Sequence, residues 1–255
     1  MSDPTVLFSL AGRTALITGP VRGIGLAIAR LFAAAGARLV LVDKDTEECA
    51  ALAAELGGVA HAADLSDAAA IANLVALPDL QSGVDVLVCN AGIAGTPSAM
   101  HEASDAEREA LYALNLLHPL RLCNAIAPRM ADAGRGGSIV LMSSLAGLRG
   151  NARLGHYGIT KAALAQLARN LAVEWGPHGI RANAIAPGLI ETSWASGIIG
   201  NPDAASRRLG LTPLRRMGTP TEIAATALYL ASDAGAFTTG QTIVVDGGTL
   251  ITDGN

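Results

Sequence analysis

The chain has 255 residues and a net charge of −4, and it is 51% hydrophobic but only 3% aromatic. This composition is apolar enough for a large core, which excludes a disordered chain. Because no run of Lys and Arg stands out and aromatic stacking residues are scarce, we expect no nucleic-acid partner.

Cysteine and histidine spacing argues against a bound metal. The three cysteines (Cys49, Cys89 and Cys123) are odd in number and widely separated, and the histidines show no HExxH spacing. Free thiols in a reducing compartment are expected. The N-terminus lacks a basic segment followed by an apolar one, and no apolar run reaches the ~18 residues that span a bilayer. We therefore predict a cytoplasmic protein without a signal peptide or membrane partner.

Apolar strand-like runs alternate with Ala/Leu-rich helical stretches along the whole chain. The predicted strands are 14–18, 37–43, 58–64, 84–92, 137–144, 180–188 and 242–246, and the predicted helices are 23–36, 46–56, 67–77, 104–132, 155–175 and 220–232. Short apolar strands separated by helices predict one doubly wound α/β domain over residues 1–255, with a seven-stranded parallel sheet covered on both faces. Residues 189–217 interrupt the alternation, and a long insertion of this kind is typical of a substrate-binding loop or lid.

The first predicted strand runs directly into a glycine-rich turn, TGPVRGIG, which contains Gly19, Gly23 and Gly25. Glycines here allow unusual backbone angles and close approach to a pyrophosphate, which then faces the positive end of the following helix. The Gly-x3-Gly-x-Gly spacing is not the GxGxxG fingerprint, so a ligand-free turn is the alternative. The order of strand, turn and helix favours a dinucleotide site.

Asp43 ends the second predicted strand and lies twenty residues after Gly23. A carboxylate at this place accepts hydrogen bonds from the ribose hydroxyls and repels a 2′-phosphate, which favours NAD over NADP. Two observations leave alternatives open. Asp43 could be an ordinary strand-end or capping residue beside Asp45 and Thr46, and Arg22 in the glycine turn could contact a 2′-phosphate.

The segment HYGITK places Tyr157 and Lys161 one helical turn apart. Such pairs are common on one face of a helix and need no functional explanation. The alternative is that Lys161 lowers the pKa of Tyr157, so that the phenol exchanges a proton near neutral pH.

Taken together, these motifs resemble the short-chain dehydrogenase/reductase family over essentially the whole chain. The segments that carry the resemblance are TGPVRGIG, ADL (63–65), CNAG (89–92), LNL with Asn115, SS with Ser144, YGITK, PGLIET (187–192) and GQTIVVDGG (240–248). The resemblance implies a Rossmann fold and oxidoreductase activity. Cys89, where the family has Asn, and Pro20, which lacks an N–H donor, depart from the family pattern.

The resemblance also implies a catalytic role for four residues. Tyr157 is the general base in alcohol oxidation and the general acid in ketone reduction, and Lys161 with the oxidised nicotinamide lowers its pKa. Ser144 stabilises the substrate oxygen, with Ser143 as the alternative assignment. Asn115 holds a water that links Lys161 to solvent, unless it is simply a surface asparagine.

By the same resemblance, the cofactor contacts are distributed over six segments. Asp64 contacts the adenine, and Ile190 and Thr192 reach the nicotinamide carboxamide, although Thr192 could instead cap a short helix. The full predicted set is Gly19, Arg22, Gly23, Ile24, Gly25, Asp43, Asp64, Leu65, Asn90, Ala91, Gly92, Tyr157, Lys161, Pro187, Gly188, Ile190 and Thr192.

The predicted substrate pocket is mostly apolar, which indicates a neutral secondary alcohol or ketone of modest size. The predicted contacts are Ser144, Leu145, Asn151, Leu154, Tyr157 and Trp194, with Ile93, Ala94, Leu189 and a lid around Ile198 and Ile199 nearby. Arg149, Arg153 or Arg207 would have to swing in to bind a carboxylate.

The chain is similar to polyol and sugar-acid dehydrogenases. The alternatives are an NADPH-dependent 3-oxoacyl-carrier-protein reductase, a catalytically silent nucleotide-binding protein, and an epimerase or dehydratase. The resemblance also predicts a homotetramer built on helices 104–132 and 155–175 and the C-terminal strand.

Overall fold

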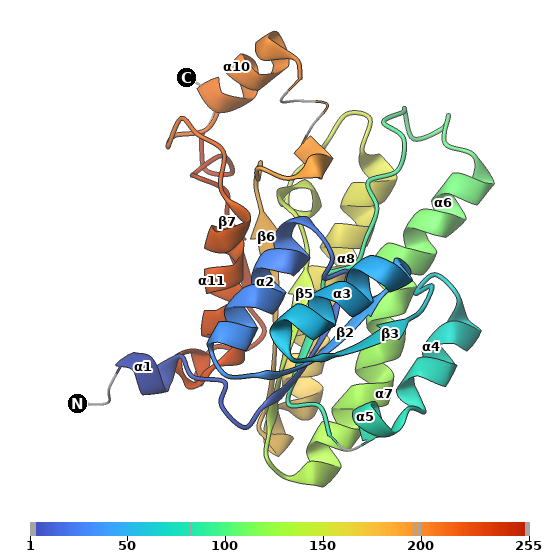
Figure 1. Ribbon diagram of the computed structural model, residues 1–255. Coiled ribbons are helices and arrows are strands. Elements are labelled where there is room, and N and C mark those ends of the chain that lie inside the picture. Colours follow the sequence, from blue (N-terminus) through green and yellow to red (C-terminus); the bar gives the residue numbers. More distant parts are fainter. Residues whose placement is uncertain (1–3, 82, 196, 198–199, 253–255) are drawn as a thin grey trace.

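The computed structural model describes residues 4–81, 83–195, 197 and 200–252. Within this part of the chain, parallel strands form one sheet in the order β3-β2-β1-β4-β5-β6-β7 (Figure 1). The strands are Thr14–Thr18 (β1), Arg38–Asp43 (β2), Val59–Ala62 (β3), Val86–Cys89 (β4), Gly137–Met142 (β5), Ile180–Pro187 (β6) and Thr242–Val245 (β7). The predicted doubly wound sheet is confirmed. The strand order reverses between β1 and β4, and ligands of such sheets bind at the carboxyl ends of the strands near this point.

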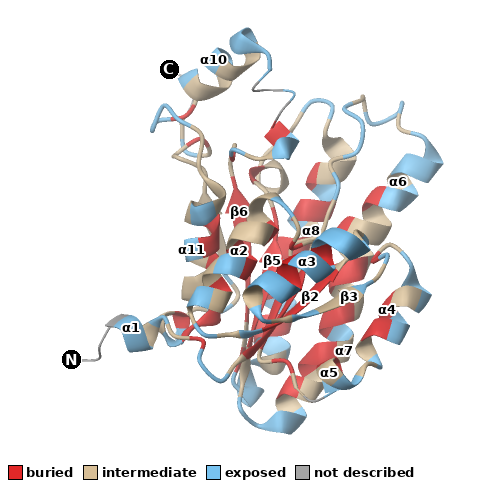
Figure 2. Cartoon of the chain, viewed as in Figure 1, coloured by how far each residue is buried: buried red, intermediate tan, exposed pale blue. Residues whose placement is uncertain are grey.

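Helices cover both faces of the sheet. They are Pro4–Leu7 (α1), Gly23–Ala34 (α2), Thr46–Leu56 (α3), Ala68–Val75 (α4), Pro78–Gln81 (α5), Asp105–Tyr112 (α6), His118–Ala133 (α7), Gly155–Trp175 (α8), Pro202–Gly210 (α10) and Pro220–Ala231 (α11). One core cluster joins the sheet to α2, α3 and α11, and the other joins it to α4, α7 and α8. Figure 2 shows the buried residues concentrated in the strands and on the inward helix faces. This two-sided burial explains why the central strands read as continuous apolar runs.

The predicted helix over 104–132 is one helical stretch, but a π-helical turn at Ala113–Leu117 joins α6 to α7. Ser104 and Glu107 start α6 with a capping box, in which each side chain accepts a hydrogen bond from the other residue's backbone N–H. Asn115 lies in the π turn and is 0% exposed. The interpretation of Asn115 as a surface asparagine is therefore wrong. Single π turns inserted in α-helices are frequent at functional sites.

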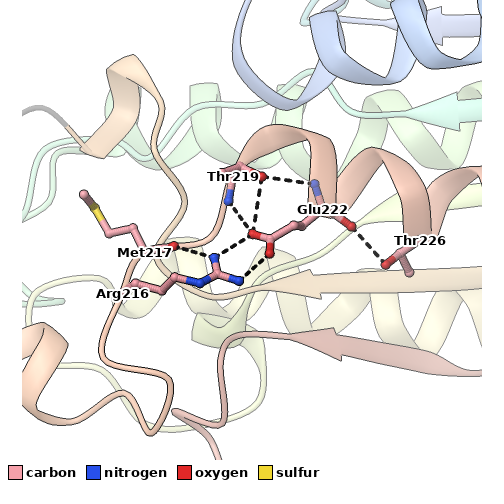
Figure 3. Close-up of polar contacts among 5 residues, drawn as sticks. All are labelled: Arg216, Met217, Thr219, Glu222 and Thr226. Atoms are coloured by element: carbon pink, nitrogen blue, oxygen red, sulfur yellow. Dashed lines mark hydrogen bonds and ion pairs between the residues drawn. The ribbon is translucent and has the colours of Figure 1, made fainter.

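The two ends of the insertion at 189–217 lie side by side and are hydrogen-bonded to each other. Glu191 N donates to Gly218 O (2.9 Å) and Gly218 N donates to Leu189 O (3.0 Å). Between these points lie a 3-10 turn at Ser193–Ala195 and α10, which the sequence did not predict as a helix. Figure 3 shows how Glu222 holds the end of the insertion against the start of α11. Its carboxylate accepts hydrogen bonds from the Arg216 guanidinium (2.5 and 3.0 Å) and from Thr219 N (2.7 Å).

We predict that Glu222 stabilises the fold in a pH-dependent way. The hydrogen bond from Arg216, followed by that from Thr219 N, lowers the pKa of Glu222 from 4.5 to about 2. Because the folded-state pKa is the lower one, this stabilisation is fully present above pH 4.5 and is lost as the pH falls toward 2. Urea unfolding of Glu222→Gln should show a lower midpoint than wild type at neutral pH, with the difference shrinking as the solution is acidified.

The matched control is Glu174→Gln, which neutralises an exposed carboxylate in α8 that belongs to none of the ion pairs found among the described residues. It should unfold like wild type at every pH. A Glu222→Gln deficit of the same size at acid and neutral pH would contradict the assignment.

Candidate active site

A cavity of about 740 Å³ opens at the carboxyl ends of the strands. Its wall contains Gly19 after β1, Asp43 at the end of β2, Asn90 after β4, and Tyr157 and Lys161 from α8. The volume lies in the range of small-molecule and cofactor sites, and the position is the one expected for a doubly wound sheet.

The glycine turn is shaped by contacts that leave no room for side chains. Gly19 has φ +67°, and a Cβ on Gly25 would lie 2.0 Å from the Gly19 carbonyl oxygen. Asn90 holds the turn from β4, because its Nδ2 donates to Gly19 O (2.9 Å) and Thr18 O (3.2 Å). Arg22 precedes α2 without capping it through its side chain. The first N–H groups of α2 therefore remain available for an anion, and the turn fits a dinucleotide pyrophosphate.

The acidic residue at the end of β2 faces the same cavity. One carboxylate oxygen of Asp43 accepts from Asp45 N (3.1 Å), which fixes the orientation of the Asp43 side chain. Asp45, not Asp43, is the N-cap of α3 and accepts from Glu48 N. The capping alternative for Asp43 is therefore wrong. Asp64 also lines the cavity, and hydrogen bonds from Ser66 lower its pKa.

Lys161 is buried, and its ammonium group donates to Met142 O at 2.8 Å. Burial lowers its pKa to about 8, so the group remains largely protonated at neutral pH. The neighbouring Ser143 hydroxyl donates to Lys161 O (2.7 Å), which ties the end of β5 to α8. None of the ion pairs found among the described residues includes Lys161. A buried cation without a carboxylate partner is costly and marks a site where a negative charge is expected.

Tyr157 lies beside this cation, with Lys161 Nζ 5.6 Å from the centroid of its ring. Burial raises the pKa of Tyr157, and a hydrogen bond with Ser144 opposes this. The lowered pKa expected from the sequence is therefore not produced by the protein's own groups, because burial of the phenol outweighs them. The Ser144 hydroxyl oxygen accepts from Ala146 N (3.1 Å), so its own hydrogen can be donated to the Tyr157 phenol or to a substrate oxygen. The choice of Ser144 over Ser143 agrees with these partners, since the Ser143 hydroxyl is engaged with the backbone of Lys161.

Asn115 connects the π turn to the segment after β4. Its Nδ2 donates to Ile93 O (2.7 Å), and Ile93 N donates to its Oδ1 (2.8 Å). Its amide lies close to Lys161, because a Cβ on Gly92 would meet both Asn115 Oδ1 (3.0 Å) and Lys161 Nζ (3.4 Å). The reciprocal hydrogen bonds hold the Asn115 side chain against the wall of the cavity.

Cys89, which stands where the family has Asn, does not disturb this arrangement. Its thiol is buried and hydrogen-bonds Cys123, and this bond together with burial raises the pKa of Cys89 well above its usual value. Asn90 supplies the amide that holds the glycine turn. Among the described residues, no group of three or more His, Cys, Asp or Glu side chains gathers where a metal ion would bind. No helix in the described ranges is long and apolar enough to cross a membrane.

The structure brings most of the predicted site residues together. Those that line the cavity are Gly19, Arg22, Gly23, Ile24, Asp43, Asp64, Leu65, Asn90, Ala91, Gly92, Ile93, Ala94, Ser144, Leu154, Tyr157, Lys161, Pro187, Gly188, Leu189, Ile190, Thr192 and Trp194. Trp194, 52% exposed, meets the Tyr157 ring edge to face at 6.0 Å. The Thr192 hydroxyl donates to Ile190 O.

Two predicted substrate contacts are not in the cavity wall. Leu145 is buried in the 3-10 turn Leu145–Gly147, and the Asn151 amide donates to Ala146 O and Arg149 O. Gly25 and Asn115 do not line the cavity themselves but contact residues that do. Arg153 donates to Pro97 O, and neither it nor Arg149 nor Arg207 lines the cavity. Ile198 and Ile199 lie outside the described residues.

Sequence reasoning missed several residues that shape the site. Met142 contributes only a backbone carbonyl, which leaves no signal in the sequence. Thr18 accepts from Asn90 N and Ala91 N through its hydroxyl. Glu48, together with Asp45, pairs with Arg22. The only sequence signal for the pairing of Arg22 with Asp45 and Glu48 is the run DKDTEE, whose pattern predicts helix capping.

Comparison with known proteins agrees with this geometry. The family model described as Enoyl-(Acyl carrier protein) reductase matches residues 19–249. The chain belongs to the short-chain dehydrogenase/reductase family. Galactitol 2-dehydrogenase (L-tagatose-forming) from Cereibacter sphaeroides is 38% identical over 251 residues, which cover 96% of this chain and 98% of that protein. D-threitol dehydrogenase from Mycolicibacterium smegmatis is 38% identical over 252 residues, covering 96% and 95% of the two chains.

This short-chain dehydrogenase/reductase also resembles a protein of known structure. It is a putative NAD(P)-dependent gluconate 5-dehydrogenase from Beutenbergia cavernae with bound NADP at low occupancy. It aligns with a TM-score of 0.89 and 34% identity over 96% of this chain and all of the other. These relatives support an oxidoreductase that acts on CH–OH groups.

Proposed function

We propose that this enzyme transfers a hydride between NAD and a secondary alcohol or ketone of the polyol or sugar type, with Tyr157 as general acid/base. The observation that carries the proposal is the placement of Tyr157 between the Ser144 hydroxyl and the buried Lys161 ammonium at the cavity wall. A catalytically silent nucleotide-binding protein has no need to bury an unpaired cation beside a phenol.

In oxidation, Ser144 and Tyr157 bind the substrate hydroxyl and Tyr157 accepts its proton. Ser144 donates the free hydrogen of its hydroxyl to the substrate oxygen, where it stabilises developing negative charge. In reduction, Tyr157 returns the proton to the ketone oxygen. Bound NAD supplies the hydride acceptor and, in its oxidised form, a positive charge in the cavity. Asn115 keeps its proposed relay role through its position beside Lys161.

The charge of Lys161 supplies a large part of the required pKa change. Lowering a phenol pKa from about 10 to about 7 takes roughly 4 kcal/mol. Lys161 Nζ lies 5.6 Å from the ring centroid, and two opposite unit charges at that separation would attract by about 3 kcal/mol at an effective dielectric constant of ~20. Burial of Tyr157 acts in the opposite direction. A second positive charge is therefore needed, and oxidised NAD is its proposed source.

Asp43 is the basis for proposing NAD rather than NADP. It lines the cavity with its carboxylate oriented by Asp45 N. A fixed carboxylate accepts hydrogen bonds from ribose hydroxyls and repels a 2′-phosphate. The NADP in the Beutenbergia cavernae structure shows that NADP binding occurs within this family.

The cavity wall favours a neutral substrate with an apolar face, and the polyol or sugar class is proposed from the relatives. Apolar side chains of Ile93, Leu154 and Leu189 surround the reactive end. Trp194 offers a half-exposed aromatic surface beside Tyr157, which suits the apolar face of a sugar or polyol. We propose that the insertion at 189–217, which carries Trp194, is the substrate-binding lid.

The proposed activity is tested by following NADH formation with a panel of polyols, sugars, sugar acids and other secondary alcohols. Oxidation of one class with NAD, at a kcat/KM at least tenfold above that with NADP, is expected; tenfold corresponds to about 1.4 kcal/mol. Reduction of a 3-oxoacyl thioester with NADPH as the preferred reaction would favour the reductase alternative. Isomerisation or dehydration without net NADH formation would favour the epimerase or dehydratase alternative.

Tyr157→Phe should lower kcat by roughly 10²- to 10⁴-fold while NADH binding measured by fluorescence changes little, because only the proton carrier is lost. The control Tyr229→Phe removes a phenol of α11 that hydrogen-bonds Thr238 and does not line the cavity. It should retain wild-type turnover. A Tyr157→Phe enzyme whose activity stays within about tenfold of wild type would refute the acid/base role.

We also propose a homotetramer in the cytoplasm. β7 is an edge strand of the sheet, and Val173 in α8 and Phe237 before β7 are strongly exposed apolar residues. Open strand edges and exposed apolar side chains are typical of association surfaces. Light scattering should give four times the chain mass of 25.8 kDa. A mass of one chain would contradict the proposal.

A further inference from the structure

Arg22 stands at the cavity wall with one nitrogen of its guanidinium group paired to carboxylates. It precedes α2 in the glycine turn, and its Nη2 lies 3.2 Å from Asp45 Oδ2 and 3.4 Å from Glu48 Oε2. Both carboxylates belong to the start of α3, which follows β2 and Asp43. Asp45 also donates its backbone N–H to Asp43. Asp45 therefore contacts both Arg22, which could bind a 2′-phosphate, and Asp43, which would repel one.

We propose that Asp45 and Glu48 are cofactor-specificity residues, which hold Arg22 away from the 2′-position of the cofactor's adenosine ribose. The proposal rests on the dinucleotide site proposed above and adds two residues to it. A free arginine is a strong phosphate ligand, because its planar guanidinium donates two parallel hydrogen bonds. With Arg22 paired to α3, the ribose end of the cavity presents Asp43 without a competing free arginine.

The pairing is weak enough to be reversed by substitution. The Arg22 side chain is 64% exposed, and exposed ion pairs change an equilibrium constant by up to about fivefold each. Removing both carboxylates should therefore release Arg22 without unfolding the protein. Asparagine at position 45 keeps a good N-cap for α3, and glutamine at position 48 keeps a good helix former.

The experiment compares the affinities of 5′-AMP and 2′,5′-ADP by calorimetry, which requires no turnover. The variants are Glu48→Gln, the double variant D45N/E48Q, and the triple variant R22Q/D45N/E48Q. The matched control is Glu47→Gln, which removes a neighbouring exposed carboxylate of the same helical turn for which the structure shows no pairing with Arg22.

D45N/E48Q should bind 2′,5′-ADP at least fivefold more tightly than wild type, with the 5′-AMP affinity changing less than about twofold. Glu48→Gln should show a smaller gain in the same direction, and Glu47→Gln should resemble wild type. The gain should disappear in R22Q/D45N/E48Q, because Arg22 is the phosphate ligand.

Three results would overturn the inference. They are an unchanged 2′,5′-ADP affinity in D45N/E48Q, an equal gain for both nucleotides, or a gain that persists without Arg22, which would indicate a general effect of removing negative charge. Binding of neither nucleotide to any variant would contradict the proposed cofactor site as well. The wild-type protein could prefer 2′,5′-ADP while the double variant still gains affinity through Arg22. That result would contradict the proposed NAD selectivity but not the role of Asp45 and Glu48.

Discussion

Lys161 carries a positive charge on a side chain that is only 2% exposed. Its ammonium group donates to Met142 O, and no carboxylate among the described residues pairs with it. Burying a cation in this way costs stability, and the cation would stabilise a negative charge that forms nearby. The phenol of Tyr157 lies where such a charge would form. The chemistry proposed for this enzyme follows from that unbalanced charge.

The elements around Lys161 hold it in place from several directions. The end of β5 supplies the Met142 carbonyl and the Ser143 hydroxyl. The π turn places Asn115 against the backbone of Ile93, where a Cβ at Gly92 would lie 3.0 Å from Asn115 Oδ1 and 3.4 Å from Lys161 Nζ. Strands and helices thus position the proposed reacting groups, while Arg22 and Trp194 lie in the glycine turn and in a 3-10 turn. This division is typical of doubly wound sheets.

Much of this arrangement was predictable from the sequence, since short apolar strands alternating with helices allow one right-handed parallel sheet. The glycine turn, Asp43 and the Tyr157–Lys161 spacing also locate the cavity. Contacts through the backbone were not predictable, because Met142 O carries no residue-type signal. The burial that raises the pKa of Tyr157 in the protein without cofactor was not predictable, since spacing along a helix does not reveal how deeply a phenol is buried. The pairing of Arg22 with α3 requires the fold that brings the two helix starts together.

The central claim is that Lys161 and oxidised NAD act together to ionise Tyr157. It is tested most directly by ultraviolet titration of tyrosinate, which is tractable because the chain has three tyrosines. The account predicts that no Tyr157 signal forms near neutral pH in the protein alone. One phenol should ionise near neutral pH when oxidised NAD is added, and this signal should be missing in Tyr157→Phe. Ionisation of Tyr157 near neutral pH without NAD, or its absence in the complex, would contradict the claim.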